Sequence, residues 1–301
     1  MLHVPRSICC DLGGLRWEDA AKIQMVGLVI QNATDTTRIN LNSLILATGL
    51  LLISFAFNPT VSLAQKPAGG KSFVENFDRL DKKHWYVSDG WSNGDHQNCT
   101  WSKEQVKIVD GRLRLGFAKQ QLKDRAYACG EVQTHKRFGH GTYEIRMKAA
   151  AGSGLNTGFF TYIGPVHKQP HDEIDFEVLG KDPSKVQVNQ YVDGKNVGEQ
   201  KLVEVPGGAD QGFNDYAFVW EKDCIRWYVN GELVAEATDP AKLPSHASKI
   251  YVSLWGSDTL KSWMGTFAEP EGPIAAEIDR VAFTAAGEAC QFPESIVCKL
   301  K

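Results

Sequence analysis

The chain lacks several patterns that identify common classes of protein. Its 33 lysine and arginine residues are scattered and the formal net charge is −3, so no electrostatic footprint for a nucleic acid is present. No Cys-x-x-Cys pair occurs after residue 64, which disfavours a zinc ribbon or a redox motif. An internal repeat is also absent, so a solenoid or a propeller is disfavoured.

One long apolar run is present, at residues 44–57. It is too short to span a bilayer comfortably but suits the core of a signal peptide, and Arg38 precedes it. Ser62 and Ala64 supply small residues at alternate positions, which predicts cleavage before Gln65. A buried helix or an uncleaved anchor is disfavoured because residues 65–72 read as a linker. We therefore expect a leader at 1–64, a secreted or periplasmic mature protein, and no stable membrane insertion after cleavage.

Export would place five of the seven cysteines, those of the mature chain, in an oxidising compartment. Two pairs can then form disulfides: Cys99 with Cys129, and Cys290 with Cys298. The first closes a loop of about 30 residues, worth roughly 3 to 4 kcal/mol. Cys9 and Cys10 would be lost with the leader, so Cys224 is expected to be unpaired, as a small buried apolar residue on a strand.

Residues 73–301 predict one all-β domain. Short strand patterns are separated by turn signals, and long stretches of helical periodicity are almost absent. The pairs Asp110-Gly111, Asp193-Gly194 and Asn230-Gly231 tolerate the positive φ angles of two-residue hairpin turns. Roughly a dozen or more such strands predict a two-sheet antiparallel β-jelly-roll sandwich.

The segment from 142 to 148 shows the strand pattern most clearly. Tyr143, Ile145 and Met147 alternate with charged residues, which predicts a half-buried antiparallel strand.

Residues 170–180 are the most informative stretch of the chain. In a strand, Glu173, Asp175 and Glu177 share one face, while the apolar residues between them point into the core. Three like charges in a row repel one another, and a merely solvated surface strand would relieve this with lysine or threonine, which is absent here. A catalytic use of the acids explains the pattern better.

Paired carboxylates suggest hydrolysis of a glycosidic bond. On a concave strand the tips of Glu173 and Glu177 could approach to about 5 Å, the separation found in retaining glycosidases. Asp175 between them should raise the pKa of a neighbouring glutamate and hold the nucleophile by a hydrogen bond. A metal site at His171, Asp172 and Glu173 is weaker, because consecutive strand residues point to opposite faces.

These residues resemble family 16 of the glycoside hydrolases, whose signature is Glu-x-Asp-x-Glu on a regular strand. The likeness runs from about residue 73 to residue 283 and includes 139–144, 159–165 and 180–182. Within the family the chain is most similar to bacterial lichenases, the endo-1,3-1,4-β-glucanases, and to rhizobial endoglycanases that trim exopolysaccharide. The resemblance implies a jelly roll with a concave substrate groove and hydrolysis with retention. It makes Glu173 the nucleophile, Glu177 the general acid and base, and Asp175 the residue that assists the nucleophile.

The resemblance also implies a set of sugar-binding residues, a disulfide at Cys99 and Cys129, and a structural calcium at Gly111 and Asp279. No cofactor is needed for the chemistry itself. The sugar-binding positions are Trp91, Asn93, Glu131, Gln133, Phe160, Tyr162, His171, Asn189, Tyr191, Trp255 and Trp263. Three positions depart from lichenases: His171 stands for Trp, Gln133 for Arg and Ser253 for Asn.

The leading hypothesis is a secreted, monomeric endo-β-glucanase that acts on a β-1,3-1,4-glucan or on an exopolysaccharide such as succinoglycan. Transglycosylation is a second hypothesis, because the His-Asp-Glu-Ile-Asp-Phe-Glu form around His171 is similar to plant xyloglucan transglycosylases. A non-catalytic, lectin-like sandwich is the third. It is disfavoured because a binder has no use for mutually repelling acids.

Overall fold

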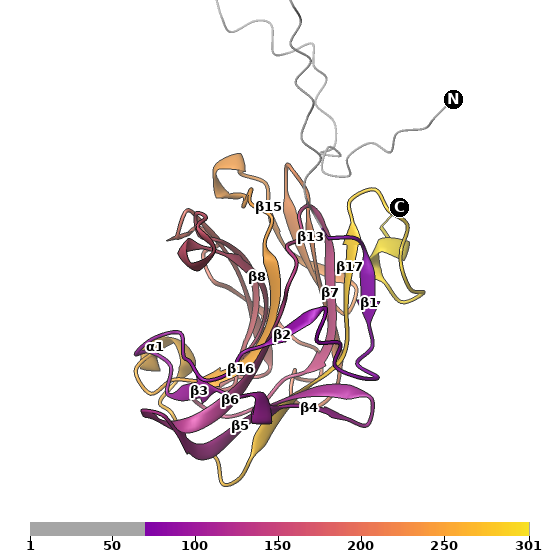
Figure 1. Ribbon diagram of the computed structural model, residues 1–301. Coiled ribbons are helices and arrows are strands. Elements are labelled where there is room, and N and C mark those ends of the chain that lie inside the picture. The colour runs from indigo at the N-terminus through magenta and orange to yellow at the C-terminus, as the bar shows by residue number, and fades with distance from the viewer. Residues whose placement is uncertain (1–69, 301) are drawn as a thin grey trace, which may run out of the picture. The chain divides into compact units, whose positions relative to one another are not determined.

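The computed structural model describes residues 70–300 (Figure 1), and the expected leader lies outside them. Strands make up nearly all the regular structure of this range, besides one short helix, α1 (Lys261–Met264). Brief 3-10 turns occupy Lys103–Gln105, Pro165–His167, Pro240–Lys242 and Ile296–Cys298. The predicted all-β class is confirmed.

One sheet, sheet A, has the strand order β15-β14-β13-β7-β17, and the other edge of β17 pairs with β1 and β5. Strand β4 pairs with β5. The bounds are β1 (Phe73–Glu75), β4 (Val106–Val109), β5 (Arg112–Leu122), β7 (Gly141–Lys148), β13 (Asn214–Trp220), β14 (Ile225–Val229), β15 (Glu232–Ala237) and β17 (Ile274–Ala285).

The other sheet, sheet B, has the order β10-β9-β8-β16-β6-β2, with β11 and β12 paired to the outer edge of β10. The bounds are β2 (Trp85–Val87), β6 (Arg125–Thr134), β8 (Leu155–Ile163), β9 (Asp172–Leu179), β10 (Lys185–Val192), β11 (Lys195–Asn196), β12 (Lys201–Glu204) and β16 (Lys249–Gly256). Figure 1 shows β8 and β16 strongly curved.

Strand β6 connects the two sheets. Its first half pairs with β5 of sheet A and its second half with β16 of sheet B. Strand β3 (Cys99–Trp101) lies parallel to the first half of β6, so the pairing is antiparallel apart from this one short contact among the described strands.

The core fills the space between the inner faces of the sheets. Phe159 and Phe176 of sheet B lie 5.7 and 6.3 Å, centroid to centroid, from Phe218 of sheet A. All three rings are fully buried. Aromatic burial on this scale dominates the energetics of a core, so it fixes the two sheets face to face.

All three expected hairpin turns are present. Asp110, Asp193 and Asn230 have φ angles of 50°, 50° and 52°, and the glycine that follows each also has a positive φ. Aspartate and asparagine accept this conformation more readily than most residues. The turn chemistry read from the sequence is therefore confirmed.

Strand β7 buries Tyr143, Ile145 and Met147, as predicted. Its outer face is less exposed than expected, because Glu144 is also buried. The C-terminal segment covers it: Ser295 Oγ donates to Glu144 at 2.7 Å and the Ile296 N–H donates at 2.8 Å. The half-buried interpretation of this strand was wrong at Glu144, since a segment distant in sequence packs on it.

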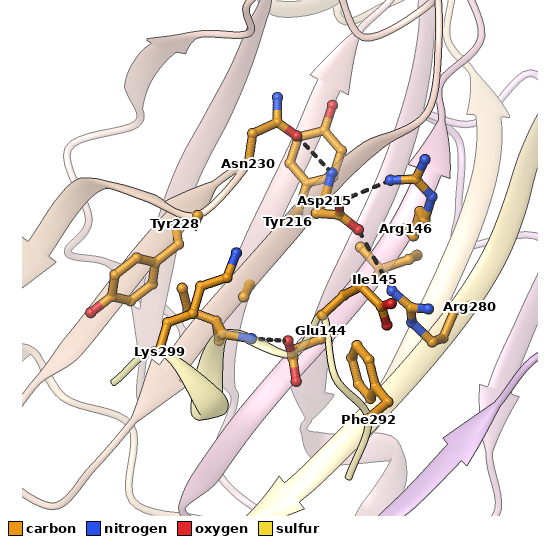
Figure 2. A pocket seen from close by; sticks show the side chains of 14 residues that line it. Glu144, Ile145, Arg146, Asp215, Tyr216, Tyr228, Asn230, Arg280, Phe292 and Lys299 are labelled. Atoms are coloured by element: carbon orange, nitrogen blue, oxygen red, sulfur yellow. Dashed lines mark hydrogen bonds and ion pairs between the residues drawn. The ribbon is translucent and has the colours of Figure 1, made fainter. Parts of the chain in front are cut away.

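A pocket lies beside that segment on sheet A (Figure 2). Arg146 and Arg280 pair with Asp215 at 2.8 and 3.9 Å, and Arg280 lies over the ring of Phe292 at 4.1 Å. These charges largely satisfy one another. We therefore assign the pocket a structural part in docking the C-terminal segment.

Both expected disulfides are present, Cys99 with Cys129 and Cys290 with Cys298. Cys224 is buried as expected, directly before β14. It is also disulfide-bonded, so the expectation of an unpaired thiol was wrong. That expectation came from counting cysteines after removal of the leader, and the leader cysteines lie outside the described residues.

Within residues 70–300, no helix is long and apolar enough to cross a membrane.

Candidate active site

Strand β9 carries the three acids on one face. Ile174, Phe176 and Val178 between them are completely buried, and the core that they enter sets the register of the strand. Glu173 and Glu177 are partly exposed on the opposite face, whereas Asp175 is 1% exposed. The predicted strand and its orientation are confirmed, and the separation of the carboxyl tips stays a prediction.

Antiparallel pairing extends each acid into a row of neighbours across sheet B. We call the surface formed by these rows the acid face. Its rows are Tyr191-Glu173-Tyr162-Lys249, Asn189-Asp175-Phe160-Tyr251-Gln133 and Gln187-Glu177-Gly158-Ser253-Glu131. Because residues opposite each other in adjacent strands point to the same side, six of the sugar-binding positions expected from the resemblance lie beside the acids in these rows.

Asp175 lies at the centre of the acid face. Burial raises its pKa well above the usual range, and the charges of Glu173 and Glu177 raise it further. Neither of its carboxyl oxygens has a hydrogen-bond partner among the described residues. A buried carboxyl group in this setting holds its proton, so Asp175 can donate a hydrogen bond to a neighbour.

Glu177 is held in the protonated form at neutral pH. Burial raises its pKa to about 8, the charge of Glu173 adds to the rise, and a hydrogen bond from Asn156 opposes it. Asn156 Nδ2 donates to Glu177 Oε1 at 2.9 Å. An acid that stays protonated near neutral pH suits general acid catalysis.

Glu173 has a different partner. His171 Nε2 lies 2.6 Å from Glu173 Oε2. The hydrogen bond with Glu173 raises the pKa of His171, and burial of the ring opposes the rise. The environments of the two glutamates therefore differ, as they do where two carboxyl groups divide the roles of acid and nucleophile.

Glu131, at the far end of the Glu177 row, is a further buried acid. Ser88 Oγ donates to it at 2.5 Å. Burial raises the pKa of Glu131 to about 7, and hydrogen bonds from Ser88 and Gln133 oppose the rise. Lys249 Nζ donates to Gln133 Oε1 at 2.9 Å. Neither Ser88 nor Lys249 was expected, since no sequence pattern marks them.

Two tryptophans form an aromatic surface at one edge of the acid face. The rings of Trp255 and Trp263 lie 6.1 Å apart, and Trp263 Nε1 donates to Gln187 Oε1 at 3.0 Å. His96 packs edge-on to Trp255 at 5.8 Å. Gln187 and His96 were missed, because only the register and a long loop bring them here.

Trp91 and Asn93 lie in the loop between β2 and β3. Trp91 packs edge-on to Trp101 at 6.3 Å, and Trp101 Nε1 donates to Asn93 Oδ1 at 3.5 Å. Their part in sugar binding stays a prediction.

The expected calcium site does not fit the arrangement of its residues. Asp279 pairs with the guanidinium groups of Arg112 and Arg146 at 3.4 and 3.6 Å. Gly111 contributes a turn with a φ of 70°. Within residues 70–300, no cluster of three or more acidic, cysteine or histidine side chains could hold a metal. Two arginines at the one carboxylate disfavour a cation there.

A family model for glycosyl hydrolases family 16 matches residues 93–271. The chain belongs to this family. Over 231 residues this family 16 member is 66% identical to the endo-1,3-1,4-beta-glycanase ExoK of Rhizobium meliloti (strain 1021), covering 77% of the chain and 85% of that protein. It is 37% identical over 242 residues to a beta-glucanase of Bacillus subtilis (strain 168), covering 80% and 96%.

Solved structures agree with these relatives. The Bacillus licheniformis beta-glucanase superimposes with a TM-score of 0.67 at 36% identity, covering 71% of this chain and 98% of that one. A lichenase from a mouse hindgut metagenome gives a TM-score of 0.68 at 36% identity, covering 71% and 99%. The jelly-roll fold and the family resemblance are confirmed, and this family 16 member is a glycoside hydrolase.

Proposed function

We propose that this hydrolase cleaves internal β-glucosidic bonds by double displacement with retention, using Glu173, Asp175 and Glu177. The observation that carries the proposal is that the acids of β9 differ in burial and in hydrogen-bond partners. Asp175 is buried and Glu177 is partly exposed, and both have raised pKa values, whereas Glu173 contacts an imidazole at 2.6 Å. One strand thus presents a proton donor and a second carboxyl group that can act as the nucleophile to the same bond.

In the first step, a Glu173 oxygen attacks the anomeric carbon and the bond to the leaving sugar oxygen breaks. Glu177 transfers its proton to that oxygen, so the leaving sugar departs neutral and Glu177 becomes a carboxylate. Asp175 retains its proton and can donate a hydrogen bond to the nucleophile. In the second step, a water molecule gives a proton to Glu177 and attacks the anomeric carbon, and Glu173 leaves as a carboxylate.

Replacement of each acid with alanine, tested with azide, separates the two roles. With an activated aryl β-glycoside, Glu173→Ala should give an α-glycosyl azide, because azide attacks in place of the missing nucleophile. Glu177→Ala should give the β-azide, because azide then attacks the glycosyl-enzyme. The same anomer from both variants, or unchanged activity in Glu173→Gln, contradicts the assignment.

The substrate class that we propose is a β-1,3-1,4-linked glucan or an exopolysaccharide such as succinoglycan. The rings of Trp255 and Trp263 offer flat surfaces for sugar C–H faces, and the amides of the rows can bind hydroxyl groups. The names of the relatives support this class. New reducing ends should be measured side by side on lichenan, laminarin, xyloglucan and succinoglycan. Release from none of the four overturns the proposed substrate class.

Transglycosylation remains a second candidate because of His171. Product lengths should be compared with and without an added oligosaccharide acceptor. Hydrolysis predicts the same short products in both, whereas longer products formed only with the acceptor identify a transglycosylase.

We also propose that the protein is exported and acts as a monomer. Disulfides persist in oxidising compartments, and the disulfide between Cys99 and Cys129 joins the paired strands β3 and β6. Cell fractionation followed by size-exclusion chromatography tests both points. Protein retained in the cytoplasm with its leader intact contradicts export, and elution at twice the monomer mass contradicts the monomer.

A further inference from the structure

His171 is held at the nucleophile by more than its hydrogen bond. It lies two residues before Glu173, directly ahead of β9, and its carbonyl accepts from the Gly194 N–H at 2.9 Å. The imidazole stacks on Tyr191 with centroids 5.2 Å apart and planes 12° apart, and it meets Tyr162 edge-on at 5.1 Å. These tyrosines are the residues that flank Glu173 across the sheet. Neighbours on both sides therefore set the direction of the ring.

The charges around the ring make His171 the counter-ion of Glu173. Burial raises the pKa values of Asp175 and Glu177 and so favours their neutral forms, and the hydrogen bond with Glu173 and the charge of Glu173 raise the pKa of His171. Asp172 adds a nearby negative charge that favours protonation of His171. The other titratable groups that face this corner are Tyr162 of β8, Tyr191 of β10, His167 against Tyr162, and Lys249 at the end of the row.

We propose that His171 is a positioning residue for the reaction: its protonated imidazole pairs with one oxygen of Glu173, keeps that carboxylate ionised among neighbouring acids, and orients it toward the anomeric carbon. This inference rests on the proposed function. When Glu173 forms the ester in the first step it loses its charge, and the pair is broken. When Glu173 leaves as a carboxylate in the second step the pair re-forms, so His171 assists departure of the nucleophile.

Two variants separate charge, hydrogen bonding and packing. His171→Gln keeps an N–H donor without the charge, and His171→Phe keeps a flat ring for Tyr191 without a donor. His140→Gln is the matched control, because His140 is exposed and lies against Trp220 on sheet A. Melting temperatures and circular dichroism establish that each variant is folded.

The decisive measurement is the pH dependence of kcat/KM. Without the cation beside Glu173, the acid limb should move to higher pH in both variants and stay in place in His140→Gln. We expect kcat to fall about tenfold to hundredfold in His171→Phe, the range of a lost charged hydrogen bond, and less in His171→Gln. KM should change little. With an aryl glycoside, slower departure of Glu173 should produce a burst of the aryl alcohol.

Two outcomes overturn the inference. If both variants keep the wild-type acid limb, His171 only packs against the tyrosines. If His171→Phe is as active as the wild type, the hydrogen bond is dispensable. Failure of the proposed function looks different: Glu173→Gln would then remain active, whatever the His171 variants do.

Discussion

The hydrogen bond from Asn156 to Glu177 should set the basic limb of the pH profile. Asn156 is fully buried and its Nδ2 lies 2.9 Å from Glu177 Oε1. A donor stabilises the carboxylate over the neutral acid, so this contact lowers the pKa of Glu177, which burial has raised to about 8. Asn156→Leu, similar in volume and without a donor, should therefore raise that pKa further.

The size of the shift follows from the strength of the contact. A hydrogen bond to a charged group is worth about 1.5 to 3 kcal/mol, and about 1.4 kcal/mol corresponds to one pKa unit. Glu177 is partly exposed, so water replaces some of the lost interaction and we expect a shift of about one unit. The basic limb of kcat/KM should move from near pH 8 to near pH 9.

The assay is kcat/KM for lichenan, or for whichever glycan is cleaved, measured from pH 4 to pH 10. Gln211→Ala is the control, because it removes an amide that donates to the exposed carboxylate of Asp210 in the loop before β13. Its profile should match the wild type. A basic limb that stays in place in Asn156→Leu, or that moves to lower pH, refutes the assignment of that limb to Glu177.

Three further predictions concern stability. Burial raises the pKa of Glu131 from 4.5 to about 7, so the charge of Glu131 destabilises the fold above pH 7 and has no effect below pH 4.5. Glu131→Gln should therefore add up to about 3 kcal/mol to the free energy of urea unfolding at pH 9 and almost nothing at pH 4. Equal effects at the two pH values would contradict this. Asp172 is buried and accepts hydrogen bonds from three backbone N–H groups. Asp172→Ala should therefore lower the free energy of unfolding by about 3 kcal/mol. A loss below about 0.5 kcal/mol would show that water replaces the carboxylate. Cys99→Ser with Cys129→Ser opens a loop of 30 residues and should cost about 3 to 4 kcal/mol, seen as a lower melting temperature than that of the wild type when both are measured without reducing agent; an unchanged melting temperature would contradict this.

Much of the acid strand could be predicted from the sequence because its signal is local. A period of two in Ile174, Phe176 and Val178 is enough to place the acids on the other face, since alternate side chains of a strand point the same way. The hairpin turns at Asp193 and Asn230 are local in the same sense. Their positive φ angles depend on the residue itself and the glycine that follows it.

Contacts between distant segments could not be predicted in this way. The burial of Glu144 depends on Ser295 and Ile296, about 150 residues further along the chain. The state of Cys224 was misjudged because a count of cysteines carries no information on which of them meet. Such contacts depend on packing that has no local pattern.

The sequence by itself determined the class of the protein. Strands with period two, glycine turns and an acid triplet on one face depend only on residues that are neighbours in the sequence. Only the tertiary structure decided how the acids differ. Equal carboxyl groups acquire different environments, because burial raises the pKa of Glu177 against the opposing hydrogen bond from Asn156 of β8, while Tyr162 and Tyr191 hold His171 against Glu173. The physical reason is that protonation depends on burial and on neighbouring charges, and strand register across the sheet sets both.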